Sequence, residues 1–128
     1  MADYSISLGN GYEIARLSAH EIAIYGDEPV QSDDDTRTNF LYVPAKITEV
    51  WWNDQYIIAK QMELEASENG YEQPPKDTSQ QVFTYWVIDV QNYRIQNTFK
   101  EEELENEIEK LGITGKVQFT SVEDLRTK

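Results

Sequence analysis

Few side chains in this chain could carry acid–base or nucleophilic chemistry. Its 128 residues include one histidine, His20, and no cysteine. Any Ser-His-acid triad or histidine metal site would have to be built around this one imidazole, and no Gly-x-Ser-x-Gly turn presents a serine. The lack of cysteine excludes disulfides and thiolate ligands. We therefore expect a non-enzymatic protein without a cofactor, in which His20 is structural, exposed or part of a pH-sensitive contact. An enzyme is the alternative if His20 faces a carboxylate and a serine in a cleft.

Carboxylates are the abundant functional groups, and three of them are consecutive. Asp33, Asp34 and Asp35 stand in a polar segment without periodicity. Calcium prefers clustered oxygen ligands, but this segment lacks the alternating acids, central glycine and final glutamate of an EF-hand loop. We expect no metal site here, and we interpret the three aspartates as a solvated charge run that could also meet a basic partner.

A second acidic group lies in a segment with helical periodicity. Glutamates in the first turn of a helix, here 101–103, are favoured by the helix dipole. Glu105 and Glu109 lie beyond that turn, and each follows another glutamate by four residues, which is mildly destabilising. An acidic face that carries this cost could be retained for a basic partner. A plain solvated face is the alternative.

Trp51 and Trp52 form an aromatic pair in a segment with strand character. Successive side chains of a strand point to opposite faces, so we expect at most one tryptophan in the core and the other exposed. An exposed tryptophan can anchor a protein contact. Stacking on a sugar and plain packing under a loop are the alternatives.

The overall charge favours one class of partner. With 24 Asp and Glu against 11 Lys and Arg, the net charge is −13. Such a surface repels nucleic-acid phosphates and anionic membranes, whereas it attracts a basic protein. Solubility alone is the alternative reason for the acidity. No apolar run approaches the roughly 18 residues of a membrane span. The start of the chain carries no secretory signal, so we expect a cytoplasmic protein, or a cell-envelope protein if a leader was removed.

The length predicts a single domain, residues 1–128. Alternating apolar residues and turn signals predict strands at 4–8, 12–17, 21–25, 40–43, 46–52, 56–64, 82–90 and 94–97, with an edge strand at 113–119. Two polar segments, 26–39 and 65–81, are expected to be long loops.

One helix is predicted near the C-terminus, over residues 99–111. Thr98 and Glu101 have capping-box spacing, Leu104, Ile108 and Leu111 share one face, and Gly112 follows. A final helical turn is expected at 121–125. The fold class is therefore α+β: a curved antiparallel sheet of about six strands, with the helix packed on one face.

Several segments resemble a family of small uncharacterised bacterial proteins, often lipoproteins, over roughly residues 4 to 113. They are Gly11-Tyr12-Glu13-Ile14, Ser18-Ala19-His20, Tyr56-Ile57-Ile58-Ala59-Lys60-Gln61, Tyr85-Trp86-Val87-Ile88-Asp89, Glu101-Glu102-Glu103-Leu104 and Lys110-Leu111-Gly112-Ile113. The chain has Gln96-Asn97 where relatives tend to have Gly-Pro before the helix. The resemblance implies a β-rich domain with one C-terminal helix and a role at the cell surface.

These observations favour a binding protein. We expect an acidic inhibitor or immunity-type factor that occludes a basic protein, with Glu105, Glu109 and Asp33 to Asp35 pairing with its lysines or arginines. Trp51 or Trp52 would anchor the contact. The alternative is a cell-envelope, lipoprotein-like domain with a structural or small-ligand-binding role.

Overall fold

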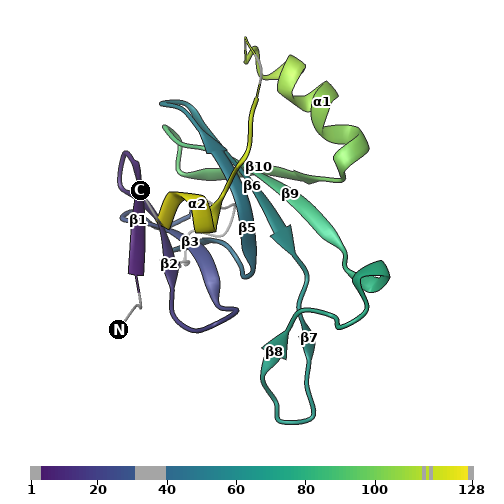
Figure 1. The fold of residues 1–128 in the computed structure, drawn as a ribbon. Helices are drawn as coiled ribbons and strands as arrows, with labels where there is room; N and C mark the ends of the chain where they lie inside the picture. Colours follow the sequence, from purple (N-terminus) through teal and green to yellow (C-terminus); the bar gives the residue numbers. More distant parts are fainter. Residues whose placement is uncertain (1–3, 31–39, 114, 116, 127–128) are drawn as a thin grey trace.

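The chain forms two main antiparallel sheets, seen in the computed structural model of the protein (Figure 1), which describes residues 4–30, 40–113, 115 and 117–126. The first sheet has the order β1-β2-β3-β4. Its strands are β1 (Tyr4–Gly9), β2 (Tyr12–Arg16), β3 (Ile22–Gly26) and β4 (Leu41–Val43). The second sheet has the order β10-β9-β6-β5-β11. Its strands are β5 (Ile47–Trp52), β6 (Tyr56–Met62), β9 (Phe83–Asp89), β10 (Arg94–Phe99) and β11 (Thr120–Ser121).

Smaller elements complete the described part of the chain. A short hairpin joins β7 (Glu65–Ala66) to β8 (Glu72–Gln73), and a 3-10 turn covers Thr78–Gln80. Two helices follow, α1 (Glu101–Lys110) and α2 (Val122–Arg126). None of the helices among the described residues has the length and apolarity needed to cross a bilayer.

The α+β class and the antiparallel pairing are confirmed, but the prediction of a single sheet is wrong. The chain leaves the first sheet after Val43 and enters the second at Ile47. Pro44 has no N–H to donate to a strand ladder, so pairing breaks between β4 and β5. Lys46 then pairs with Met62 of β6 through its backbone, at N–O distances of 3.2 and 2.8 Å. The two halves of the predicted sheet are therefore separate sheets.

Two boundaries near the C-terminus also differ from the prediction. Thr98 does not cap the helix, because β10 continues to Phe99, which pairs with Tyr85. The N-cap is Lys100, whose N–H donates to Glu103 Oε1 at 3.0 Å. The predicted edge strand at 113–119 is absent from its described residues, and pairing with β5 is confined to β11. The predicted final helical turn is confirmed as α2. The segment 65–81, predicted to be a long loop, contains the β7–β8 hairpin.

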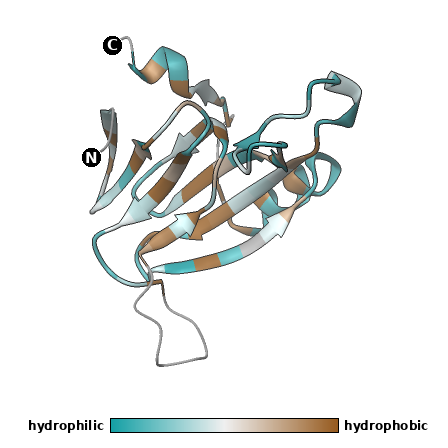
Figure 2. Cartoon of the chain, turned by 90° about the horizontal axis from the view of Figure 1, so that it is seen from below, coloured by the Kyte–Doolittle hydropathy of each residue, from teal (hydrophilic) through white to brown (hydrophobic). Residues whose placement is uncertain are grey.

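The core lies in two parts, one on each face of the second sheet. Between the sheets, Ile57 and Ala59 of β6 pack with buried side chains of β1 to β5, β9 and α2. On the other face, Ile58 of β6 and Val87 of β9 pack beneath Leu104 of α1. This division follows from the alternation of side chains along a strand. Figure 2 shows the apolar residues concentrated in the central strands and polar residues over much of the periphery.

One buried amide ties the crossing between the sheets to the second sheet. Gln61 is the one buried amide or charged side chain among the described residues. Its Nε2 donates to the carbonyl of Ala45 at 2.8 Å, and its Oε1 accepts from the Trp86 indole at 2.9 Å. Because Ala45 lies in the crossing, Gln61 fixes where the chain passes from β4 to β5.

We predict that Gln61→Leu destabilises the fold by about 2 kcal/mol, because the Ala45 carbonyl and the Trp86 N–H both lose their partner in a partly buried site. Urea unfolding measures the change in free energy. The control Gln91→Leu, at an exposed position, should stay within about 0.5 kcal/mol of the parent. Equal effects of the two substitutions would contradict this role of Gln61.

Candidate functional site

Helix α1 covers the outer face of the second sheet. Leu104 is buried against Ile58, Tyr85 and Val87, while Ile108 and Leu111 are half-buried in the same cluster. The prediction that these three helix residues face the sheet is confirmed. Because only Leu104 is buried in α1, the helix rests on the sheet without filling the space beside it.

A cavity of about 390 Å³ lies in that space, and we name it the α1 groove. Its lining combines apolar side chains, two aromatic rings and two carboxylates: Tyr85, Glu101, Leu104, Glu105, Ile108, Val117 and Phe119. The rings of Tyr85 and Phe119 lie 5.6 Å apart at an angle of 55°. Glu101 and Glu105 are one helical turn apart, so they lie on the same side of α1.

A second hollow of about 310 Å³ adjoins the α1 groove and shares Tyr85 and Glu101 with it. Two lysines, Lys60 and Lys100, line this second hollow. The Nζ atom of Lys60 lies 3.3 Å from Glu49 and 4.5 Å from the centre of the Phe83 ring. Burial raises the pKa of Tyr85, and the charge of Lys60 opposes this rise. The phenol therefore stays neutral and can act as an apolar wall with a polar tip.

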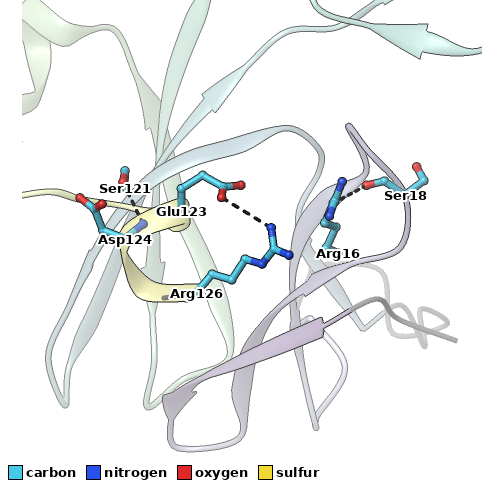
Figure 3. A network of polar contacts seen from close by, with 6 residues as sticks. All are labelled: Arg16, Ser18, Ser121, Glu123, Asp124 and Arg126. Carbon is cyan, nitrogen blue, oxygen red and sulfur yellow. Dashed lines mark hydrogen bonds and ion pairs between the residues drawn. The ribbon is translucent and has the colours of Figure 1, made fainter. Parts of the chain in front are cut away.

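The C-terminal segment supplies the far wall of the α1 groove, and α2 holds this segment in place. Val122 of α2 is buried in the core between the sheets. Arg126 pairs with Glu123 at 3.7 Å. Figure 3 shows this pair on the side of α2 that faces Arg16 of β2. Both guanidinium groups lie over the Tyr4 ring, at 5.2 Å for Arg126 and 5.9 Å for Arg16. These contacts fasten the chain just after Phe119.

The structure brings only part of the predicted site together. Glu105 lines the α1 groove, and Glu109 is exposed on the same row of the helix one turn further on. Trp51 and Trp52 pack in the two different cores, so their opposite orientation is confirmed. Both are half-buried, however, so the prediction that one is exposed is wrong. Asp33, Asp34 and Asp35 lie outside the described residues.

Sequence reasoning missed Tyr85 and Phe119 as site residues. Tyr85 belongs to the most apolar strand, and this pattern predicts a core residue. Phe119 lies in a segment whose pattern predicts an edge strand. The alternation of β9 could have placed Tyr85 on the face beneath α1. No local signal brings Phe119 to it, because the two residues are far apart in the sequence.

The single histidine lies in a different hollow of about 340 Å³, lined in part by Ser18, Glu21 and Glu72. The Nδ1 atom of His20 lies 3.4 Å from Nζ of Lys46. Burial is the largest cause that lowers the pKa of His20, and the charges of Lys46 and Arg16 lower it further. The neighbour of Nδ1 is thus a cation, whereas a hydrolase triad places a carboxylate there.

Comparison with known families now places the chain. A family described as a protein of unknown function, DUF3997, matches residues 9–123. The chain belongs to this family. The match includes the residues that line the α1 groove and every strand except β1, of which it includes only Gly9. No curated protein and no solved structure matches the chain.

No group of three or more histidine, aspartate or glutamate side chains is arranged to hold a metal ion within the part of the DUF3997 chain that the structure describes. The α1 groove places two carboxylates beside apolar and aromatic side chains, and this lining can accommodate a group that is apolar in part and positively charged in part.

We predict that the NMR titration of His20, which gives one imidazole signal in this chain, yields a pKa below 6.5. Lys46→Met should raise that pKa toward 6.5 without reaching it, because burial remains. Lys76→Met, at an exposed lysine, is the control and should change nothing. A pKa unaffected by Lys46→Met would contradict the contact.

The lowered pKa of His20 also predicts how stability depends on pH. Because the folded-state pKa lies below the unfolded value, the unfolded chain binds the proton more readily as the pH falls below 6.5. Stability should therefore decrease from about pH 6.5 downward through the folded-state pKa, and His20→Gln should lessen this decrease in urea unfolding. If His20→Gln left the pH dependence of stability unchanged, this contribution of His20 would be contradicted.

Proposed function

We propose that the protein binds a basic segment of another protein in the α1 groove and thereby occludes it, as an inhibitor or immunity-type factor does. The observation that carries this proposal is the combination of Glu101 and Glu105 at one side of a cavity with an apolar and aromatic floor. Such a cavity accepts the stem of a long cationic side chain while its head pairs with the carboxylates.

The charge pattern of α1 supports a partner rather than local stability. Glu101, Glu105 and Glu109 follow one another at four-residue spacing along the helix. Adjacent like charges at this spacing destabilise a helix by a few tenths of a kcal/mol per pair, and Glu109 also lies near the negative end of the dipole. A bound cation would remove that repulsion.

The whole-chain charge supports a protein as the ligand. A net charge of −13 slows the approach of nucleic acid and anionic lipid and speeds the approach of a basic protein. We propose a cytoplasmic setting. The lipoprotein character implied by the family resemblance would place the same groove at the cell envelope, with the same chemistry of recognition.

We predict that immobilised protein retains one basic protein from a lysate of its source organism at low salt, and that Glu105→Lys with Glu109→Lys abolishes this retention. Reversing the charge of the row should repel the partner. The control is Glu65→Lys with Glu68→Lys, at two exposed glutamates that do not line the α1 groove. This control makes the same change in net charge and should still retain the partner. Salt of about 0.5 M should release it.

Two results would contradict the proposal. One is equal retention by both double variants, which would mean that net charge alone attracts the protein. The other is no stoichiometric partner at either salt, which would favour the envelope or small-ligand alternative.

We also predict that Glu105→Gln with Glu109→Gln stabilises the isolated protein by about 0.5 kcal/mol while it weakens partner binding, because the like-charge pairs are removed. Thermal unfolding at low salt measures the gain, which should shrink as salt screens the charges. Glu68→Gln is the control. A loss of stability would mean that these carboxylates support the fold.

A further inference from the structure

We infer that the α1 groove selects arginine over lysine in the partner's basic segment. This inference rests on the proposed function and specifies which side chain the groove accepts. It comes from a comparison of two adjoining positions on the same face of the second sheet.

The first position is filled by the chain's own lysine. Glu49, Lys60 and Tyr85 are direct neighbours across β5, β6 and β9. The Lys60 ammonium lies 3.3 Å from the Glu49 carboxylate, 4.5 Å from the centre of the Phe83 ring and 6.0 Å from that of Tyr85. A cation between a carboxylate and aromatic rings is therefore an arrangement that this sheet face already contains.

The second position is the α1 groove, which also places carboxylates beside aromatic rings. Tyr85 is shared between the two positions, and Phe119 adds a second ring 5.6 Å from it. Two carboxylates, Glu101 and Glu105, line the α1 groove, and Glu101 also borders the first position. Among the described residues, the lining of the α1 groove includes no lysine or arginine, whereas Lys60 and Lys100 line the adjoining hollow.

Arginine satisfies these components better than lysine does. Its planar guanidinium can stack on an aromatic ring while its five N–H groups pair with two carboxylates at once. It is also more weakly hydrated than an ammonium, so an apolar floor such as Leu104 and Ile108 costs it less solvation. A lysine ammonium can pair with one carboxylate beside a ring, as Lys60 does. It lacks the planar fork that would pair with two carboxylates while it stacks on a ring.

The test uses the full chain, labelled with ¹⁵N, and three peptides with the sequence Gly-Leu-X-Ser-X-Leu-Gly, in which X is arginine, lysine or citrulline. Titration at low salt gives the Kd and shows which amides shift. We expect the arginine peptide to bind about tenfold more tightly than the lysine peptide. Citrulline, which is neutral and has a similar shape, should bind least, and the shifts should centre on 101–108 and 117–119.

A pair of matched variants isolates the aromatic wall. Phe119→Leu keeps the cavity apolar but removes one ring, so it should bring the two affinities together while the lysine peptide still binds. Phe40→Leu, at an exposed phenylalanine of 45% exposure elsewhere, should leave the tenfold preference intact. Because Lys116 precedes Val117 in the sequence, the titration is repeated with Lys116→Met, for which we expect the same preference.

The outcomes separate this inference from the proposed function. Equal binding of the arginine and lysine peptides at the α1 groove would overturn the arginine preference and leave the basic-segment proposal in place. Binding of neither peptide, or shifts located elsewhere, would overturn both.

Discussion

The fold depends on two central strands that are apolar on both faces. In β6 the consecutive Ile57 and Ile58 are both buried, and in β9 the consecutive Val87 and Ile88 are as well. A strand of this kind must be covered on both sides, because burial of apolar surface is the main favourable contribution to folding. The first sheet covers one side and α1 the other (Figure 1). The placement of the first sheet on one face and of α1 on the other follows from this requirement.

The α1 groove is a consequence of how the second side is covered. A ten-residue helix covers only part of a five-stranded sheet, and its one fully buried side chain is Leu104. Tyr85 is buried beside Leu104, and the chain returns after α1 to bring Val117 and Phe119 to the same groove. Since α2 is fastened through Val122 and Arg126, the groove has one wall from a helix and one from an anchored segment. This construction leaves room beneath an acidic rim.

The sequence predicts the local elements well and their assembly poorly. Most strands and the helix follow from alternation and periodicity, which are local properties of residues such as Leu104 and Ile108. The separation into two sheets depends on Pro44, which has no backbone N–H to continue the strand pairing. It also depends on Gln61, whose side chain donates a hydrogen bond to the carbonyl of Ala45. The meeting of Tyr85 with Phe119 depends on the whole course of the chain between them. The acidic row of α1 could be found from spacing alone, but the cavity that gives Glu105 a role could not.

Site-specific photo-crosslinking tests most directly whether a basic partner contacts the α1 groove. A photo-reactive amino acid replaces Val117, which lines the groove without contributing charge, and in a second protein it replaces Tyr71, an aromatic residue of 76% exposure outside the groove. The account predicts that the probe at position 117 joins one protein of the source organism through a basic, arginine-containing segment, and that the probe at position 71 does not. Crosslinking of that protein only from position 71, or equally from both, would contradict it.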